Sequence, residues 1–151
     1  MRSLKIAVII SRFNEVITHR LLQSCLAELK KSGVKNSNVI LSWVPGALEL
    51  PVTALKYARE KDVAVVICLG AVIRGETYHF ELVAQECARG IMDVSLLTGK
   101  SIIFGVLSTN TIEQANDRSS LKGGDNKGRD AAQAALEMSD VLARVKTNRK
   151  K

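Results

Sequence analysis

Aromatic residues, prolines and cysteines are all scarce in this chain of 151 residues. Aromatic side chains make up 4% of the sequence, which holds only two prolines and three cysteines. Cys25, Cys68 and Cys87 are odd in number and show no C-x-x-C spacing, so neither a disulfide framework nor a metal cluster is indicated. Each lies among apolar residues, which is typical of a buried structural thiol.

Long apolar runs and a secretory leader are lacking as well. No apolar run approaches the roughly 18 residues that a membrane span requires, and the N-terminal MRSLKIAVIIS has no cleavage site. With 46% hydrophobic and 25% charged residues, the composition is that of a soluble globular protein. We therefore expect a single domain over residues 1–151 that is cytoplasmic and has no membrane partner.

Positive charge is concentrated at the C-terminal end. The formal net charge is +7, but five basic residues lie in the last eight, RVKTNRKK, so the rest of the chain carries only +2. A basic segment without aromatic residues or a motif is more often a solvated end than a binding arm. We expect residues 144–151 to form a basic tail that need not be ordered, and we expect no nucleic-acid partner.

Four short runs rich in Val and Ile alternate with segments of helical spacing. The runs are LKIAVII, NVILSWV, VAVVICLG and SIIFGVL, and they are expected to be strands buried on both faces. The alternation predicts an α/β fold with a four-stranded parallel sheet and helices on both faces. Gly33 and Gly99 are typical helix stops, and Asn110 is the expected cap of a short helix. Gly90 indicates close packing or a small break, and the last helix should span about 128–145.

Ligands of such sheets bind beyond the carboxyl ends of the strands, so the residues that follow each strand are candidates. After the first strand comes Phe13, which either closes the core or offers a stacking surface for a flat ring, next to Asn14 as a helix cap. Taken alone, the loop favours closure of the core. After the second strand, Gly46 and Glu49 form either a plain capped turn or a reader of a polar heterocycle's edge.

The third and fourth strands are followed by groups suited to an anion. Gly75 allows close backbone approach, and the amides of Glu76 and Thr77 at a helix start form an anion site beside His79. Arg118 and Lys127 flank a Gly-rich turn after the fourth strand and suit a phosphate, although surface solvation explains either one equally well. The convergence of four loops predicts a site for an aromatic heterocycle and a phosphorylated partner.

Several familiar fingerprints are missing from the chain. There is no G-x-G-x-x-G after the first strand, no G-x-x-x-x-G-K-[ST], no G-x-S-x-G and no metal-ligand spacing. We therefore expect proton-transfer chemistry without a metal.

Five segments, in order and with nearly the same spacing, resemble the lumazine synthase family. They are SRFNEVIT, WVPGALELP, LGAVIRGETYHFE, FGVLSTNTIEQANDR and NKGRDAAQAALEM, and the resemblance runs from Lys5 to about Met138. It implies a flavodoxin-like three-layer α/β/α sandwich. It also implies the condensation, without a cofactor, of 5-amino-6-(D-ribitylamino)uracil with 3,4-dihydroxy-2-butanone 4-phosphate to 6,7-dimethyl-8-ribityllumazine. This is the penultimate step of riboflavin biosynthesis, so a functional link to riboflavin synthase is implied as well.

The resemblance also implies roles for the candidate residues. His79 would transfer protons, Arg118 would stabilise the departing phosphate, and Phe13 would stack on the pyrimidine. The other residues that it places at the site are Ala47, Leu48, Glu49, Val72 and Ile73 for the pyrimidine and ribityl chain, Gly75, Glu76 and Thr77 for the phosphate, and Lys127 and Phe104 for further substrate contacts. Members of the family are homopentamers whose active sites lie between subunits, with Phe104 reaching into the neighbour's pocket.

Three departures from the family pattern bear on assembly and binding. The N-terminal extension is short, Leu48 stands where an aromatic residue often follows VPGA, and the loop SLKGGDNKG is one residue longer than usual. The longer loop accompanies pentamers that do not build icosahedral shells, so a pentamer is expected. Two alternatives remain open: an archaeal-type riboflavin synthase, whose substrates carry no phosphate, and a non-catalytic flavin or lumazine binder, which would not need His79 or Arg118.

Overall fold

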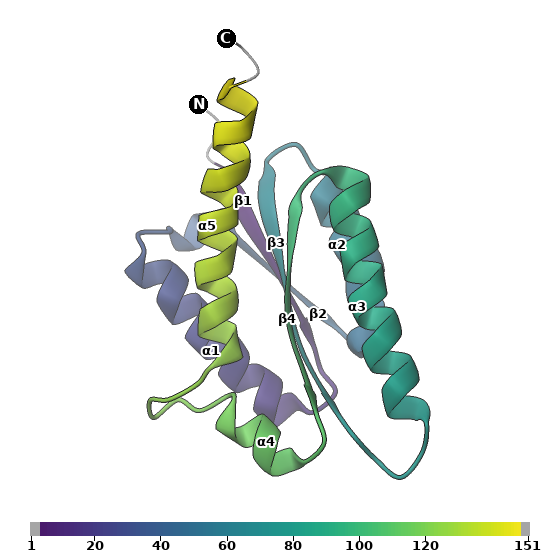
Figure 1. Ribbon diagram of the computed structural model, residues 1–151. Coiled ribbons are helices and arrows are strands. Elements are labelled where there is room, and N and C mark those ends of the chain that lie inside the picture. The colour runs from purple at the N-terminus through teal and green to yellow at the C-terminus, as the bar shows by residue number, and fades with distance from the viewer. Residues whose placement is uncertain (1–3, 149–151) are drawn as a thin grey trace.

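Four parallel strands form the middle layer of the protein in a computed structural model that describes residues 4–148 (Figure 1). They are β1 (Lys5–Ser11), β2 (Val39–Val44), β3 (Val63–Ile73) and β4 (Ser101–Thr109), in the order β2-β1-β3-β4. All three strand pairings are parallel, which confirms the predicted sheet. β3 continues to Ile73, beyond Gly70 where its predicted run ends, and so carries the chain further toward the loops at the carboxyl end.

Helices cover both faces of the sheet. α1 (Glu15–Lys31) and α5 (Lys127–Asn148) lie on one face, and α2 (Leu50–Arg59) and α3 (His79–Thr98) lie on the other (Figure 1). A short helix, α4 (Ile112–Asp117), follows β4, and 3-10 turns at Asn36–Asn38 and Ala47–Glu49 precede β2 and α2. This three-layer arrangement confirms the expected flavodoxin-like sandwich.

Each face of the sheet has its own apolar core, because successive strand side chains point to opposite faces. Leu21 and Ile67 are fully buried on the α1 and α5 side, and Ile9 and Leu50 are fully buried on the α2 and α3 side. The three cysteines are free and buried, as predicted. Burial raises the pKa of the Cys25 thiol to about 12 and that of the Cys87 thiol to about 11.

Two glycines allow helices to approach one another closely. A Cβ atom at Gly128 would lie 1.9 Å from the carbonyl oxygen of Leu21, so the start of α5 packs directly on the backbone of α1. A Cβ atom at Gly90 would lie 2.7 Å from Cγ of Pro51, so α3 packs on the start of α2 at this point. Close packing is therefore the reason for a glycine inside α3, and the helix is not broken there.

The helix ends agree with the sequence at two glycines and differ at one cap. Gly33 follows α1 with a φ of 88°, and Gly99 caps α3 with a φ of 66°, both in the left-handed region that favours glycine. The predicted cap Asn110 is wrong by one residue. Thr111 caps α4, since its hydroxyl oxygen accepts a hydrogen bond of 3.2 Å from the backbone N–H of Gln114.

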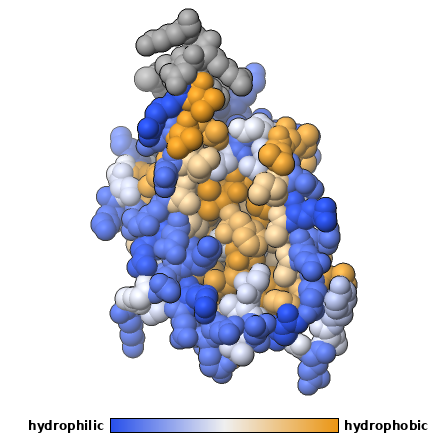
Figure 2. All heavy atoms as spheres, in the orientation of Figure 1, coloured by the Kyte–Doolittle hydropathy of each residue, from blue (hydrophilic) through white to orange (hydrophobic). Residues whose placement is uncertain are grey.

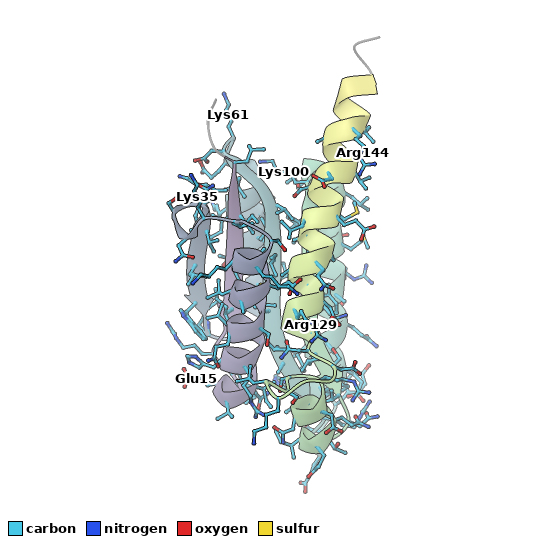
Figure 3. All side chains as sticks on the ribbon, turned by 90° about the vertical axis from the view of Figure 1, so that its left-hand side faces the viewer. Glu15, Lys35, Lys61, Lys100, Arg129 and Arg144 are labelled. Carbon is cyan, nitrogen blue, oxygen red and sulfur yellow. The ribbon has the colours of Figure 1, made fainter. Side chains whose placement is uncertain are left out.

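The C-terminal helix is longer than predicted. α5 ends at Asn148, so residues 144–148 of the expected basic tail continue the helix, and residues 149–151 lie outside the described part of the chain. Figure 3 shows Lys35, Lys61 and Lys100 near the amino ends of the strands and Glu15 at the opposite end, where the candidate loops lie. Within residues 4–148 no helix is long and apolar enough to cross a membrane.

Candidate active site

A pocket of about 450 Å³ lies at the carboxyl end of the sheet, on the side covered by α2 and α3. This volume is in the range of small-molecule sites. Three of the four candidate loops contribute to it, because the carboxyl ends of parallel strands gather at one edge. Its lining residues are Phe13, Pro45, Gly46, Ala47, Leu48, Glu49, Ala71, Val72, Ile73, Gly75, Thr77, His79, Phe80 and Val83.

Phe13 stands at the pocket with its ring turned to solvent. Its side chain is 73% exposed, so the expectation that it closes the core is wrong and a stacking surface remains. Its backbone N–H donates a hydrogen bond of 3.1 Å to the carbonyl oxygen of Pro45. The next residue, Asn14, has a left-handed backbone with a φ of 60° and makes no side-chain cap. Its Nδ2 atom donates instead to the carbonyl oxygen of Ala71, at 2.9 Å. Hydrogen bonds therefore hold this loop to the segment that follows β2 and to the end of β3.

The loop after β2 forms one side of the pocket through a capped turn. The backbone N–H of Gly46 donates a hydrogen bond of 2.9 Å to Oε2 of Glu49, so this carboxylate stabilises its own turn. Ala47 is buried and Leu48 is 48% exposed, and both line the pocket. The plain capped turn is thus present, and it places Glu49 at the pocket wall at the same time.

The end of β3 and the loop after it bring together apolar and polar groups. Val72 and Ile73 line the pocket at the strand end, and Gly75, Thr77 and His79 continue the lining. The backbone N–H of His79 donates a weak hydrogen bond of 3.4 Å to the Thr77 hydroxyl oxygen. The helix begins later than predicted, because α3 starts at His79 and the sequence interpretation placed the helix start at Glu76 and Thr77. The partial positive end of α3 therefore lies at His79 and faces the loop that precedes it.

Four predicted site residues lie outside the lining of this pocket in the described chain: Glu76, Arg118, Lys127 and Phe104. Arg118 and Lys127 are exposed, and Nη1 of Arg118 donates a hydrogen bond of 3.1 Å to the carbonyl oxygen of Gln114. Phe104 lies in the middle of the edge strand β4, half-buried against the core beneath α2 and α3. The pocket of one chain is therefore lined by the aromatic ring and the histidine, but not by the two cations predicted to bind a phosphate.

Arg74 is a polar residue beside the site to which the sequence interpretation assigns no role. Its guanidinium forms an ion pair with Glu81 and donates a hydrogen bond of 2.9 Å from Nε to Oδ1 of Asn110. The hydrogen bond from Arg74 lowers the pKa of the Glu81 carboxyl. The sequence does show an arginine directly after a buried strand and before a glycine. It does not show the partners of this arginine, because they come from two other segments.

Within residues 4–148 no group of three or more His, Cys, Asp and Glu side chains is arranged so that it could hold a metal ion. The polar groups of the pocket are instead a carboxylate, a hydroxyl and an imidazole beside an aromatic ring. Such a set can stack a flat ring, bind its polar edge and exchange protons with it.

A comparison with protein families gives one match that covers most of the chain. Residues 3–143 match the family model described as 6,7-dimethyl-8-ribityllumazine synthase. The match includes every residue that lines the pocket, and it includes the four predicted residues outside the lining.

Proposed function

The chain belongs to the 6,7-dimethyl-8-ribityllumazine synthase family, and we propose that it condenses 5-amino-6-(D-ribitylamino)uracil with 3,4-dihydroxy-2-butanone 4-phosphate. The products are 6,7-dimethyl-8-ribityllumazine, phosphate and water, and we place this reaction in the cytoplasm. The observation that carries the proposal is the convergence in one pocket of an exposed ring, Phe13, with His79 and the loop at Gly75 and Thr77.

The pocket suits the pyrimidine substrate. The exposed face of Phe13 is a stacking surface for the heterocyclic ring, and a stacked aromatic pair contributes about 0.5–1.5 kcal/mol beyond its buried area. Val72 and Ile73 supply an apolar wall next to the stacked ring, where the backbone of β3 can form hydrogen bonds with the ribityl chain. In this proposal Ala47, Leu48 and Glu49 contact the ring from the side of the capped turn.

The loop after β3 suits the phosphorylated ketone. Gly75 leaves space for an oxygen to approach the backbone. Apart from Gly75 and its two chain neighbours, no described residue has an atom within 4 Å of its Cβ position. The amides of Glu76 and Thr77 and the positive end of α3 lie next to that space and favour a negative group. Arg118 and Lys127 complete the phosphate site in the proposal, although neither lines the pocket of one chain.

The reaction needs proton transfers and a stabilised leaving group. The amine attacks the ketone and gives an imine with loss of water, phosphate departs as an anion, and ring closure expels a second water. His79 acts as the general acid and base, since an imidazole exchanges protons efficiently near neutral pH. Arg118 and the loop amides stabilise the departing phosphate, and the holding of two substrates side by side supplies much of the rate.

We further propose a homopentamer in which neighbouring subunits complete each site. Figure 2 shows an apolar strip over β4 between α5 and α3, bordered by hydrophilic side chains. Large apolar side chains on the two helices are exposed in one chain, including Met92, Leu96, Leu97 and Val145. An exposed apolar surface of this kind marks an interaction site. Phe104 lies on β4 itself, so association over this strip would bring it next to a second chain.

The test is an assay of the purified protein with both substrates, following lumazine absorbance and free phosphate together. Equal appearance of the two products is the expected result. Tight binding of lumazine or a flavin without turnover would refute the synthase and leave a binding protein. In the same assay, Arg118→Ala should raise the KM for the butanone phosphate far more than the KM for the pyrimidine, and equal effects on both would remove Arg118 from the phosphate site.

A further inference from the structure

Arg74 joins three segments that meet at the candidate site. Its backbone N–H donates a hydrogen bond of 2.8 Å to the carbonyl oxygen of Thr109, so the chain leaves β3 beside the end of β4. Its guanidinium pairs with Glu81 on the first turn of α3 and donates from Nε to Asn110, which follows β4. The guanidinium carbon also lies 4.5 Å from the centroid of the Phe80 ring, within the range of a cation–π contact.

The position of these partners in the chain defines a closed loop. Arg74 directly precedes the segment 75–79, and Phe80 and Glu81 directly follow it. The ion pair and the ring contact therefore connect the two ends of the segment that carries Gly75, Thr77 and His79 to the pocket. Gly75 and its neighbours are exposed, so packing alone does not fix this segment.

The second arm of Arg74 extends toward the helix that precedes Arg118. Oδ1 of Asn110 accepts from Arg74, and the backbone N–H of Asn110 donates a hydrogen bond of 2.8 Å to Oε1 of Gln114. The carbonyl oxygen of Gln114 in turn accepts from Nη1 of Arg118, at 3.1 Å. A continuous chain of polar contacts thus links the loop that carries His79 to the segment that carries Arg118. The β3–α3 loop and α4 lie at the same end of the sheet (Figure 1).

We propose that Arg74 is a positioning residue that holds the 75–79 loop in its phosphate-binding shape and fixes its distance from the α4 segment. This inference rests on the proposed function, because the phosphate is that of the butanone substrate. The arrangement needs an arginine: a planar fork donates to Glu81 and Asn110 at once while its face lies on Phe80. The Arg74 and Glu81 side chains are 43% and 24% exposed, so the pair stabilises the fold little and acts through geometry.

The variants that test this are Arg74→Ala and Arg74→Lys, with Arg89→Ala as the matched control. Arg89 also pairs with a glutamate of α3, Glu86, at 3.5 Å, but this pair lies within α3 and does not connect the 75–79 segment to anything. We expect Arg74→Ala to raise the KM for the butanone phosphate by about tenfold, because a small misplacement of positioning groups costs up to about a hundredfold. The KM for the pyrimidine should change by less than about twofold. Arg74→Lys should behave like the alanine variant, since a single ammonium replaces a fork.

A wild-type KM in Arg74→Lys, or equal changes in both KM values in Arg74→Ala, would overturn the inference. Hydrogen exchange separates its failure from that of the proposed function, since exchange needs no substrate. Arg74→Ala should speed amide exchange at His79 to Leu82 and at Asn110 relative to Arg89→Ala, with melting temperatures of the two variants alike. Unchanged exchange would refute the positioning role even if the wild type makes lumazine. If Arg74→Ala exchanges faster but the wild type makes no lumazine, the positioning role is supported and only the synthase is refuted.

Discussion

Gly75→Ala separates the requirements of the fold from those of the ligand. Apart from Gly75 and its two chain neighbours, no described residue has an atom within 4 Å of a Cβ at this position. The φ of Gly75 is outside the left-handed region. Alanine therefore fits the backbone without strain. Because alanine has less freedom in the unfolded chain, the substitution should raise the free energy of unfolding by about 0.4–1 kcal/mol.

The same methyl group should impair binding of the phosphorylated ketone. It would occupy the open space through which a phosphate oxygen reaches the amides of the 75–77 segment. Loss of one hydrogen bond to a charged group costs about 1.5–3 kcal/mol. This corresponds to a KM for the butanone phosphate, and a Kd for inorganic phosphate, that rise roughly ten- to a hundredfold. The KM for the pyrimidine should stay close to the wild-type value.

The assay combines urea unfolding, calorimetric phosphate binding and steady-state kinetics. Gly33→Ala is the matched control, since its Cβ position is equally open among the described residues but its φ is 88° and it does not line the pocket. We expect the reverse pattern in the control, a lower free energy of unfolding and an unchanged KM for the ketone. A Gly75→Ala protein that is more stable and binds phosphate as well as the wild type would refute the placement of the phosphate at this loop.

Three further predictions follow from named contacts. His79→Ala should lower kcat by about a hundredfold or more while the Kd for the pyrimidine is retained, and full activity would remove His79 from the mechanism. Gly128→Ala should lower the free energy of unfolding in urea by at least about 1–3 kcal/mol, because its Cβ would lie 1.9 Å from the Leu21 carbonyl oxygen, and a neutral result would mean that α1 and α5 separate easily. In the folded state the pKa of Cys25 is raised to about 12 and that of Cys87 to about 11, so both thiols contribute fully to stability below pH 9. Above pH 9 each contribution should fall by about 1.4 kcal/mol per pH unit. The fall should continue to about pH 11 for Cys87 and about pH 12 for Cys25. Urea unfolding at pH 8, 9 and 10 measures this loss, and a constant free energy would contradict it.

The sheet was predictable because burial on both faces dictates composition. A strand such as Val63–Ile73 must be apolar at successive positions, and its enrichment in Val and Ile favours a strand over a buried helix. The caps were less predictable. Asn14 has the residue type of a cap, but its side chain finds a partner in Ala71, which is far away in the sequence and adjacent in the sheet. Tertiary contacts of this kind compete with the local hydrogen bonds from which caps are inferred.

The candidate site residues also differ in how well the sequence predicts their position. Residues that closely follow a strand, such as Phe13 and Gly75, line the pocket because the strand itself carries them to the edge of the sheet. Arg118 and Lys127 are separated from β4 by α4 and a long turn, and their positions depend on how that turn folds. The sequence could not show that neither residue lines the pocket of its own chain.

Large apolar side chains are exposed around the pocket and over β4 (Figure 2). Phe13, Leu48 and Tyr78 are 73%, 48% and 65% exposed on three successive loops, and an isolated domain gains nothing from large apolar groups held in water. The strip over β4 has the same character (Figure 2), and Phe104 belongs to that strand. If copies of the chain associate through these surfaces, burial of the apolar groups drives assembly, and the same contact brings the missing polar groups to the pocket. Stability of the assembly and completion of the site then depend on one interface, so a substitution that weakens it should impair both together.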